Sequence, residues 1–273
     1  MKLLHISDLH FREHYRKAQS GYLSVVYRMT SPLVHLEKCF TSVDLGTIDG
    51  VVISGDLTEN GSAQDYRHLK SFLDRNLNSK PVFLTLGNHD NKHAFRTGWG
   101  LNPEKEAMSD PYNQVHVLKD HLIICLDNAL AGYPNGLFST EQLDWLGGVI
   151  TEYPHQKKIL VFHHSLLTIQ AEIPPAQWDS RFYNLIAEHK FVGLLCGHTH
   201  HQYFGDFANV PYTTAPSMSF RGTNNLDDGK VKFDEFPGYQ ICDFSASPMA
   251  AEPYYLLDKP RYLTTIEIGD LKI

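Results

Sequence analysis

The sequence lacks long apolar runs and an excess of basic residues. No apolar stretch approaches the ~18–20 residues that a membrane-spanning helix needs, so no membrane span is expected. The first residues, MKLLHISDLH, contain too short an apolar stretch for a secretory signal peptide, and they are typical of a first strand. The formal net charge of −7 disfavours a reader of the nucleic-acid backbone, which normally carries a basic face.

Cysteine is scarce, and no CxxC pair occurs. The four cysteines are scattered along the chain, at Cys39, Cys125, Cys196 and Cys242. Three of them follow apolar residues, which favours small buried hydrophobic side chains over a redox, metal or disulfide role. Because nothing calls for disulfides, a reducing compartment fits, and we expect a cytoplasmic protein.

Internal repeats, low-complexity tracts and long linkers are also absent, so residues 1–273 are expected to form a single domain. Short apolar runs of strand length occur in the first two-thirds of the chain, at residues 2–6, 51–54, 82–86, 122–126, 159–162 and 192–196. Helical patterns lie between them. Ser31 with Pro32 and Ser62 are typical helix starts, Ser139 with Gln142 matches a capping box, and a fourth helix is expected around residues 182–186.

This alternation of strands and helices predicts an α/β fold with helices covering a sheet. After residue 201 the chain becomes rich in strands, at residues 210–214, 231–233, 239–244 and 262–268. We expect a second sheet, packed on the first, to contain them. For residues 11–29 and 203–237, a dimer contact, an active-site cap and simple loops are all open, and a homodimer is one interpretation.

Polar clusters follow five of the six predicted strands in the first two-thirds of the chain. They contain the residue types that bind metal ions, namely Asp8, His10, Asp56, Asn88, His163, His198 and His200. In open α/β sheets, ligands bind at the carboxyl ends of the strands. The sequence therefore predicts that these side chains converge on one metal centre.

The spacing of these residues has a physical reason. In D-x-H and H-x-H, side chains two residues apart on an extended segment point the same way. Gly55, Gly87 and Gly197 precede ligand candidates and permit tight turns. Asp56 is the lone acidic residue of the central cluster, so it is the candidate to bridge two cations. Oxygen and imidazole ligands without thiolate suit Mn, Fe, Zn or Co.

In this order, the motifs DLH at 8–10, GD at 55–56, GNHD at 87–90, His163 and GHTH at 197–200 resemble the calcineurin-like metallophosphoesterase superfamily. The resemblance covers roughly residues 1–220. Residues 136–146 and TAPS at 214–217 are similar to the branch of bacterial class III cyclic nucleotide phosphodiesterases and glycerophosphodiesterases. The resemblance implies a four-layer α/β/β/α sandwich, with two mixed sheets flanked by helices.

The resemblance also divides the candidate ligands between two divalent metal ions. It implies a first metal site formed by Asp8, His10, Asp56 and His200. It implies a second site, sharing Asp56, formed by Asp56, Asn88, His163 and His198. His89 would be a catalytic histidine beside the metals, oriented by Asp90.

The chain departs from this branch near the expected substrate entrance. Ser165 and Leu166 stand where two prolines often follow the His-His pair, and the segment between His10 and Ser31 is longer than usual. Substrate preference is therefore the least defined property. The candidates for substrate contacts are His164, His201, Arg12 and Arg221.

Together these features predict a dinuclear metal-dependent phosphodiesterase that hydrolyses small phosphodiesters, foremost 3′,5′-cyclic nucleotides such as cAMP. In this hypothesis two cations about 3.5–4 Å apart share a water with a lowered pKa, and the resulting hydroxide attacks phosphorus in line with the departing alkoxide. A glycerophosphodiesterase and a phosphomonoesterase are the alternatives. A nuclease and a non-catalytic scaffold rank below them, since no basic–aromatic face is evident and no ligand is missing.

Overall fold

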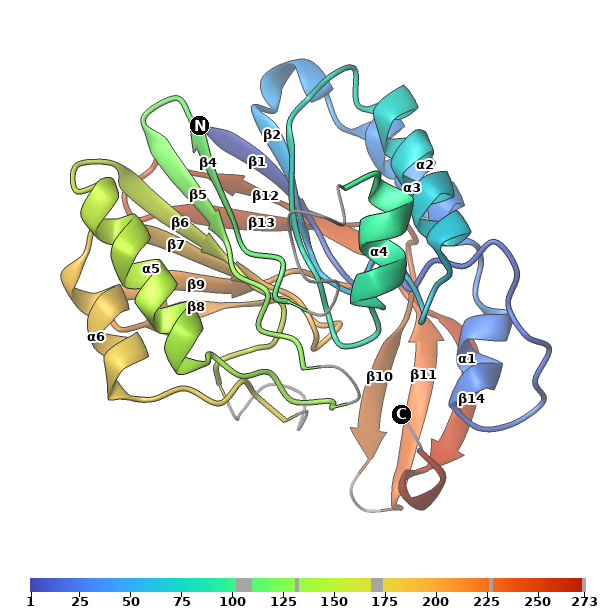
Figure 1. Cartoon of the computed structure of the whole chain (residues 1–273). Coiled ribbons are helices and arrows are strands. Elements are labelled where there is room, and N and C mark those ends of the chain that lie inside the picture. Colours follow the sequence, from blue (N-terminus) through green and yellow to red (C-terminus); the bar gives the residue numbers. More distant parts are fainter. Residues whose placement is uncertain (102–109, 131–132, 168–173, 226–227, 272–273) are drawn as a thin grey trace.

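The computed structural model describes residues 1–101, 110–130, 133–167, 174–225 and 228–271. Two large sheets pack against each other (Figure 1). The first has the order β13-β12-β1-β2-β3, with β1 Lys2–Ile6, β2 Gly50–Ser54, β3 Val82–Thr85, β12 Gly238–Asp243 and β13 Ala250–Tyr255. The second has the order β4-β5-β6-β7-β9-β8, with β4 Gln114–Leu118, β5 His121–Cys125, β6 Lys157–Val161, β7 Phe191–Cys196, β8 Tyr203–Phe207 and β9 Val210–Thr214.

Helices cover the outer face of each sheet, which gives the predicted four-layer sandwich (Figure 1). On the side of the first sheet lie α2 Pro32–Ser42, α3 Ala63–Asn76 and α4 Lys92–Trp99. On the side of the second lie α5 Thr140–Glu152 and α6 Ser180–Glu188. Between the sheets, a buried layer includes Leu3, Val52, Ile123, Ile159 and Leu195. The predicted α/β class with two mixed sheets is confirmed.

Several predicted helix starts are confirmed at atomic detail. The Ser139 hydroxyl accepts from the backbone N–H of Gln142, and the Gln142 side chain accepts from the backbone N–H of Ser139, as in the predicted capping box. Ser62 forms a second box with Asp65 at the start of α3. Ser31 precedes α2, but its side chain makes no capping hydrogen bond, so Pro32 provides the start signal there.

The prediction for the strands after residue 201 was wrong in its topology. β8 and β9 extend the second sheet, whereas β12 and β13 join the first through antiparallel pairing of β12 with β1. A third, three-stranded sheet has the order β10-β11-β14, with β10 Arg221–Asn225, β11 Lys230–Glu235 and β14 Arg261–Glu267. Because side chains alternate with a period of two in every strand, the sequence pattern does not show which distant strand is the partner.

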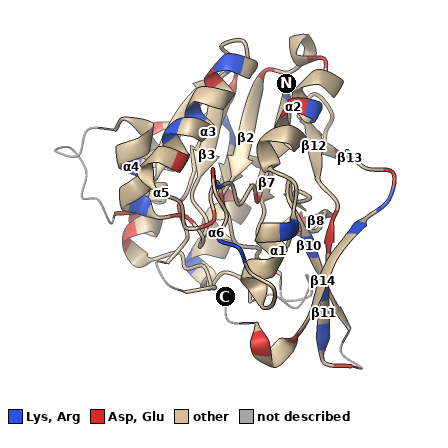
Figure 2. Cartoon of the chain, turned by 90° about the vertical axis from the view of Figure 1, so that its right-hand side faces the viewer, with Lys and Arg blue, Asp and Glu red and all other residues tan. Residues whose placement is uncertain are grey.

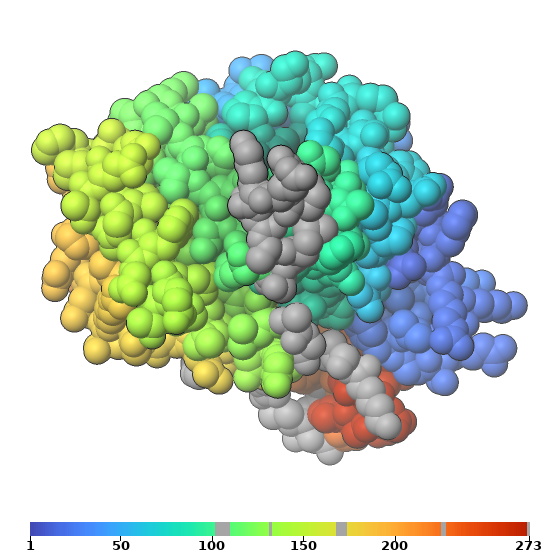
Figure 3. Space-filling model, viewed as in Figure 1, coloured from blue at the N-terminus to red at the C-terminus, as the bar shows by residue number. Residues whose placement is uncertain are grey.

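We call the third sheet together with α1 Tyr22–Arg28 the cap. It extends from one end of the sandwich, where the C-terminal strand lies close to the N-terminal helix (Figures 1 and 3). The cap has its own apolar core, which includes Val25, Val26, Phe233, Leu263 and Ile266. Parts of the two segments of open role, 11–29 and 203–237, therefore meet in one structural unit.

None of the described helices is long and apolar enough to cross a membrane. The four cysteines are buried and unpaired, as predicted. Lys and Arg are interspersed with Asp and Glu along the described elements in Figure 2. Two short 3-10 helices, η1 Leu45–Thr47 and η2 Ile268–Asp270, complete the secondary structure.

A buried glutamate fastens the cap to the sandwich. Glu235 at the end of β11 is 1% exposed, and its carboxylate accepts from Thr30 N at 2.7 Å and from His35 Nε2 at 2.9 Å. Arg261 of β14 pairs with its other oxygen. Burial alone would raise the pKa of Glu235, but these donors outweigh burial and lower it to about 2.

We predict that Glu235→Gln lowers the free energy of unfolding at pH 7 by on the order of 2–3 kcal/mol. Because the folded-state pKa lies below the unfolded value of about 4.3, this stabilisation is present above that value and is lost as pH falls towards about 2. Urea unfolding at several pH values measures the effect. Glu267→Gln, at an exposed ion pair with Lys230, is the control and should change little. A wild-type advantage that did not shrink in acid would contradict the assignment.

Candidate metal centre

Loops from both large sheets meet at one end of the sandwich. Asp8 and His10 follow β1, Asp56 follows β2 and Asn88 follows β3, whereas His163 follows β6 and His198 and His200 follow β7. Backbone hydrogen bonds hold these loops in register: Asp8 N donates to Gly55 O at 3.1 Å, His10 N to Asp56 O at 2.9 Å, and Gly197 N to His163 O at 3.0 Å. The predicted convergence therefore involves the strand ends of two sheets rather than one edge of a single sheet.

A first group of four candidates lies together. They are Asp8, His10, Asp56 and His200, and one ligand atom of each residue lies within 4.8 Å of the ligand atoms of the other three. Asp8, His10 and Asp56 are at most 1% exposed. Four donors gathered this closely, with two buried carboxylates, could hold a cation.

Hydrogen bonds fix the tautomers of two histidines in this group. His10 Nδ1 donates to Glu59 Oε2 at 2.7 Å, and His200 Nδ1 donates to the carbonyl oxygen of Phe220 at 2.6 Å. Their Nε2 atoms lie 3.1 Å apart. When both rings are neutral, both Nε2 atoms carry lone pairs, and this close approach is favourable only with a cation or a proton between them.

A second group lies on the other side of Asp56. His163 Nδ1 donates to Ser54 O at 2.7 Å, and its Nε2, which carries a lone pair when the ring is neutral, lies 3.2 Å from Asn88 Oδ1. His198 Nε2 is buried and has no hydrogen-bond partner among the described residues. Ligand atoms of His163, His198 and also His164 lie within 4.8 Å of one another. Such acceptor-rich surroundings again fit a bound cation.

Asp56 connects the two groups. Its Oδ2 is 3.5 Å from His10 Nε2 and 3.3 Å from His163 Nε2, and its Oδ1 accepts from His89 N at 2.9 Å. Burial alone would raise the pKa of Asp56, but the neighbouring histidines outweigh burial and hold it well below its usual range. The donor set of carboxylate, amide and imidazole, without thiolate, suits two divalent cations of the Mn, Fe, Zn or Co type.

The backbone at these loops differs from the extended form that the spacing suggested. The left-handed φ region is occupied by Asp8 (54°), His10 (51°), Asp56 (48°), His198 (71°) and His200 (58°). The extended-chain explanation of D-x-H and H-x-H was therefore wrong. Left-handed residues cost roughly 1–2 kcal/mol each for side chains with a Cβ, and such strain is concentrated at functional sites.

The three glycines serve different purposes. Gly55 has φ +96° and makes a turn that other residues rarely adopt. Gly87 has no such φ, but a Cβ there would lie 2.1 Å from Asp56 Oδ1. At Gly197 a Cβ would lie 1.8 Å from Ser7 Oγ. The second and third glycines thus permit close packing of the loops rather than a tight turn.

His89 lies beside the two groups, and Glu59 orients it. His89 Nδ1 donates to Glu59 Oε1 at 3.0 Å, while Tyr22 donates to Glu59 Oε2 at 2.9 Å. One carboxylate thereby fixes both His89 and the metal-ligand candidate His10. Burial would lower the pKa of His89, but the charges of Asp56 and Glu59 outweigh it and raise the pKa to about 9. Among the described residues, its Nε2 makes no side-chain hydrogen bond like that of Nδ1.

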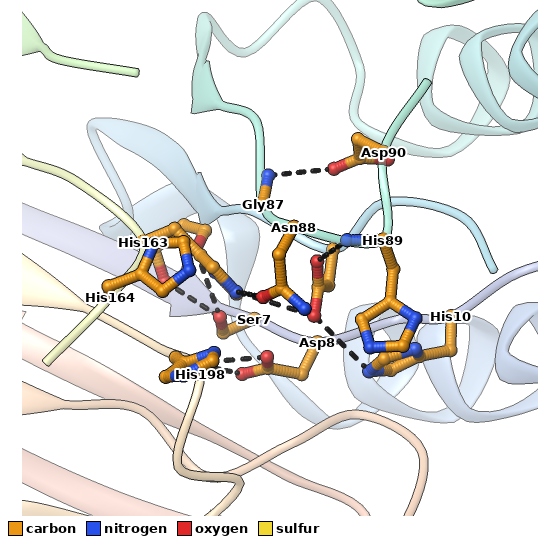
Figure 4. A network of polar contacts seen from close by, with 12 residues as sticks. Ser7, Asp8, His10, Gly87, Asn88, His89, Asp90, His163, His164 and His198 are labelled. Carbon is orange, nitrogen blue, oxygen red and sulfur yellow. Dashed lines mark hydrogen bonds and ion pairs between the residues drawn. The ribbon is translucent and has the colours of Figure 1, made fainter. Parts of the chain in front are cut away.

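The prediction that Asp90 orients His89 was wrong. Asp90 Oδ2 accepts from Leu57 N and Gly87 N, each at 3.0 Å, and Oδ1 accepts from Tyr66 OH at 2.8 Å. Figure 4 shows the carboxylate turned towards Gly87. Asp90 therefore ties the loop after β2 to the loop after β3, and it supports the site without touching the catalytic candidate.

None of the four predicted substrate contacts lines the cavity at the site, among the described residues. His164 is fully buried and donates from Nδ1 to Asn128 at 3.3 Å. His201 Nε2 donates to Gly222 O at 2.7 Å. Arg12 donates to Glu59 O and Asn60 O, both at 3.0 Å. Arg221 stacks over Phe236 at 4.5 Å. Each side chain is committed to internal contacts.

The cavity beside the donor groups has a volume of about 280 Å³. His10, Asp56, Asn88 and His198 line it together with His89, and cap residues form much of the remainder. Sequence reasoning missed Glu59, Tyr22 and Phe220, all of which contact site histidines. Glu59 is three residues beyond Asp56, but no local pattern distinguishes its carboxylate from a solvated one.

The comparisons with known proteins agree with this chemistry. The family model described as calcineurin-like phosphoesterase matches residues 1–202. A probable cyclic nucleotide phosphodiesterase of Rhodococcus erythropolis is 28% identical over 187 residues, which is 66% of this chain and 61% of that protein. The glycerophosphodiester phosphodiesterase GpdQ of Enterobacter lignolyticus is 25% identical over 244 residues, covering 87% and 84% of the two chains.

A solved structure supports the fold alone. The protein TT1561 of Thermus thermophilus has a TM-score of 0.58, 12% identity, and coverage of 92% of this chain and 97% of that one. The chain thus spans less than two thirds of the R. erythropolis relative and nearly all of TT1561.

We predict that Glu59→Gln lowers turnover about 10–100-fold, since partners that orient metal-ligating histidines typically have effects of that size. The isosteric amide removes the charge that His10 and His89 share, and it replaces one of the two oxygens that accept from them with a donor. Asp90→Asn is the comparison, because its contacts are to Leu57, Gly87 and Tyr66: it should lower the melting temperature more than the specific activity of the folded protein. Steady-state kinetics and thermal unfolding separate the two. If Asp90→Asn lowered the specific activity more than the melting temperature, the result would support the predicted role of Asp90 in orienting His89.

Proposed function

The chain belongs to the calcineurin-like phosphoesterase family, and from this premise we propose that it is a metal-dependent phosphoric diester hydrolase with a dinuclear centre. Its proposed substrates are small phosphodiesters, with 3′,5′-cyclic nucleotides such as cAMP ahead of glycerophosphodiesters. The observation that carries the proposal is the pair of buried donor groups joined by Asp56, with His89 beside them.

In this proposal, one cation would be held by Asp8, His10, Asp56 and His200, and the other by Asp56, Asn88, His163 and His198. When bound, two divalent cations supply Lewis-acid polarisation of phosphoryl oxygens and lower the pKa of water towards neutrality. Asp56 shares its negative charge between the two positions. Asn88 contributes a neutral oxygen, so the second position has fewer negative ligands than the first.

The protein side chains provide orientation and proton handling. Glu59 holds His89 through Nδ1, so that Nε2 is the atom left to meet the substrate. When it is protonated, His89 can donate from Nε2 to a developing negative charge or to the departing oxygen. Tyr22 in turn holds Glu59, so the cap contributes to the orientation of the catalytic candidate.

The relative from R. erythropolis supports a cyclic nucleotide as substrate, because its name assigns that activity and its identity is 28%. Glycerophosphodiester hydrolysis is the second candidate. It is supported by GpdQ of E. lignolyticus, which matches a larger share of this chain, 87% against 66%. The two activities use the same phosphodiester chemistry and differ only in the groups on phosphorus.

We predict that Asp56→Ala abolishes hydrolysis and strongly reduces the bound metal, because the bridging position is lost. His89→Ala should retain near-normal metal content while turnover falls about 10²–10⁴-fold, as expected for loss of an acid–base group. Plasma emission spectrometry of the purified variants measures metal, and steady-state assays measure turnover. A fully active His89 variant would remove its assigned role.

The decisive experiment is a substrate panel with added Mn²⁺. We expect hydrolysis of bis(p-nitrophenyl) phosphate and cAMP at higher kcat/KM than of glycerophosphoethanolamine and of p-nitrophenyl phosphate. Asp56→Ala protein prepared in parallel controls for contaminating phosphatases. A strong preference for the monoester would contradict a phosphodiesterase, and a preference for glycerophosphoethanolamine over cAMP would favour the second candidate. If the protein bound no metal and hydrolysed none of these esters, the result would indicate a non-catalytic scaffold.

A further inference from the structure

One wall of the cavity differs in chemistry from the wall that the ligand candidates form. This wall is apolar and comes mainly from the cap and the segments adjoining it, with Tyr22, Phe220, Val231, Phe233, Ile268 and Leu271. Residues of both metal-ligand groups line the same cavity, namely His10, Asp56, Asn88, His198 and His200. A molecule that reached the donors would therefore contact the apolar wall at the same time.

The wall begins directly beside the donor histidines. The Phe220 ring lies 4.7 Å from the ring of His200 and 5.1 Å from that of His10, measured between centroids. From there the aromatic surface continues to Phe233, at 6.0 Å, and to Tyr22, at 6.1 Å. The backbone carbonyl of Phe220 also accepts from His200 Nδ1, so the segment that carries the ring is tied to that ligand candidate.

The wall is also preformed. Phe220, Val231 and Phe233 are 3%, 5% and 6% exposed, and they pack in the apolar core of the cap with Val25 and Leu263. Glu235 fastens this unit to α2 and to the segment before it. A preformed apolar surface binds without an ordering cost, which makes it effective for recognition.

We propose that this wall is a subsite for the organic group of the phosphoester, and that it selects a flat apolar group, such as an aryl ring or a nucleobase, over a small polar group such as glycerol. The inference rests on the proposed function and specifies its substrate class. An aromatic group would bury apolar surface and stack near Phe220 and Phe233, whereas glycerol would lose hydrogen bonds to water without replacing them.

The size of the cavity limits the group further. A volume of about 280 Å³ lies at the lower end of the range for small-molecule sites, which is roughly 300–1,000 Å³. It suits a phosphoryl group with one ring system attached. A long acyl chain or a polymer would have to extend beyond the wall, so small aromatic or nucleoside phosphoesters are the class that fits.

A matched pair of diesters tests the subsite by turnover. Methyl p-nitrophenyl phosphate and phenyl p-nitrophenyl phosphate share one leaving group and differ only in the group that stays on phosphorus. With the Mn²⁺-loaded protein we expect the phenyl diester to have a kcat/KM about tenfold higher or more, in keeping with the discrimination that apolar contacts provide. Equal values would overturn the proposal.

Two variants make the wall more polar. The first keeps the side-chain volume nearly constant, and the second lies at an exposed position. Val231→Thr exchanges a methyl group for a hydroxyl group, and Ile268→Thr changes a wall residue that is 43% exposed and therefore tolerant. We expect each to lower the phenyl-to-methyl ratio at least threefold. Val117→Thr on β4, 59% exposed and outside the cavity, is the matched control and should keep the wild-type ratio. An unchanged ratio in both wall variants would contradict the inference.

A binding measurement separates this inference from the proposed function. Isothermal titration calorimetry of the Mn²⁺-loaded protein with phenylphosphonate and methylphosphonate needs no turnover. We expect phenylphosphonate to bind about tenfold more tightly, with the ratio reduced in Val231→Thr and Ile268→Thr. If neither diester is hydrolysed but the phenyl preference persists, the phosphodiesterase assignment fails and the subsite stands. Equal affinities of the two phosphonates would overturn the subsite alone.

Discussion

The carboxylate of Asp56 lies where the two large sheets meet, and the arrangement of the site depends on its contacts. One oxygen faces His10 from the first sheet and His163 from the second, and the other accepts from the backbone of His89. Three loops that are far apart in sequence are thus directed at one negative charge. Gly87 is required for this arrangement, because a side chain there would occupy the position of the Asp56 carboxylate.

The site is built at a cost in stability. Five of the ligand candidates have left-handed backbone conformations, and several buried imidazoles direct lone pairs at one another or at oxygens. Such features are unfavourable in the protein alone and become favourable around cations. The close-packed layers on both faces of each sheet, together with Asp90 between the loops after β2 and β3, hold this strained arrangement in place.

The cap links recognition to catalysis through direct contacts. Tyr22 holds Glu59, which orients His89, and Phe220 fixes His200 through its carbonyl oxygen while its ring forms part of the apolar wall. The family fold supplies the donor groups, and the cap of this chain supplies the surface that an organic substituent would contact. In the proposed function, changes in the apolar wall of the cap would alter substrate preference.

The sequence alone determined the α/β class, the helix caps at Ser62 and Ser139, and the set of seven ligand candidates. These features are local: a strand, a cap or a polar cluster at a strand end is encoded within a few residues. The division of strands among three sheets, the contact of Glu59 with His10 and His89, and the structural role of Asp90 were decided only by the tertiary structure. Glu59 is 49 residues from His10, and the cap joins residues 22–28 to a strand at 261–267, so no local periodicity records these contacts. Arg12, Arg221, His164 and His201 show the same limit, because a sequence identifies the chemistry of a side chain but only packing decides which partners it meets.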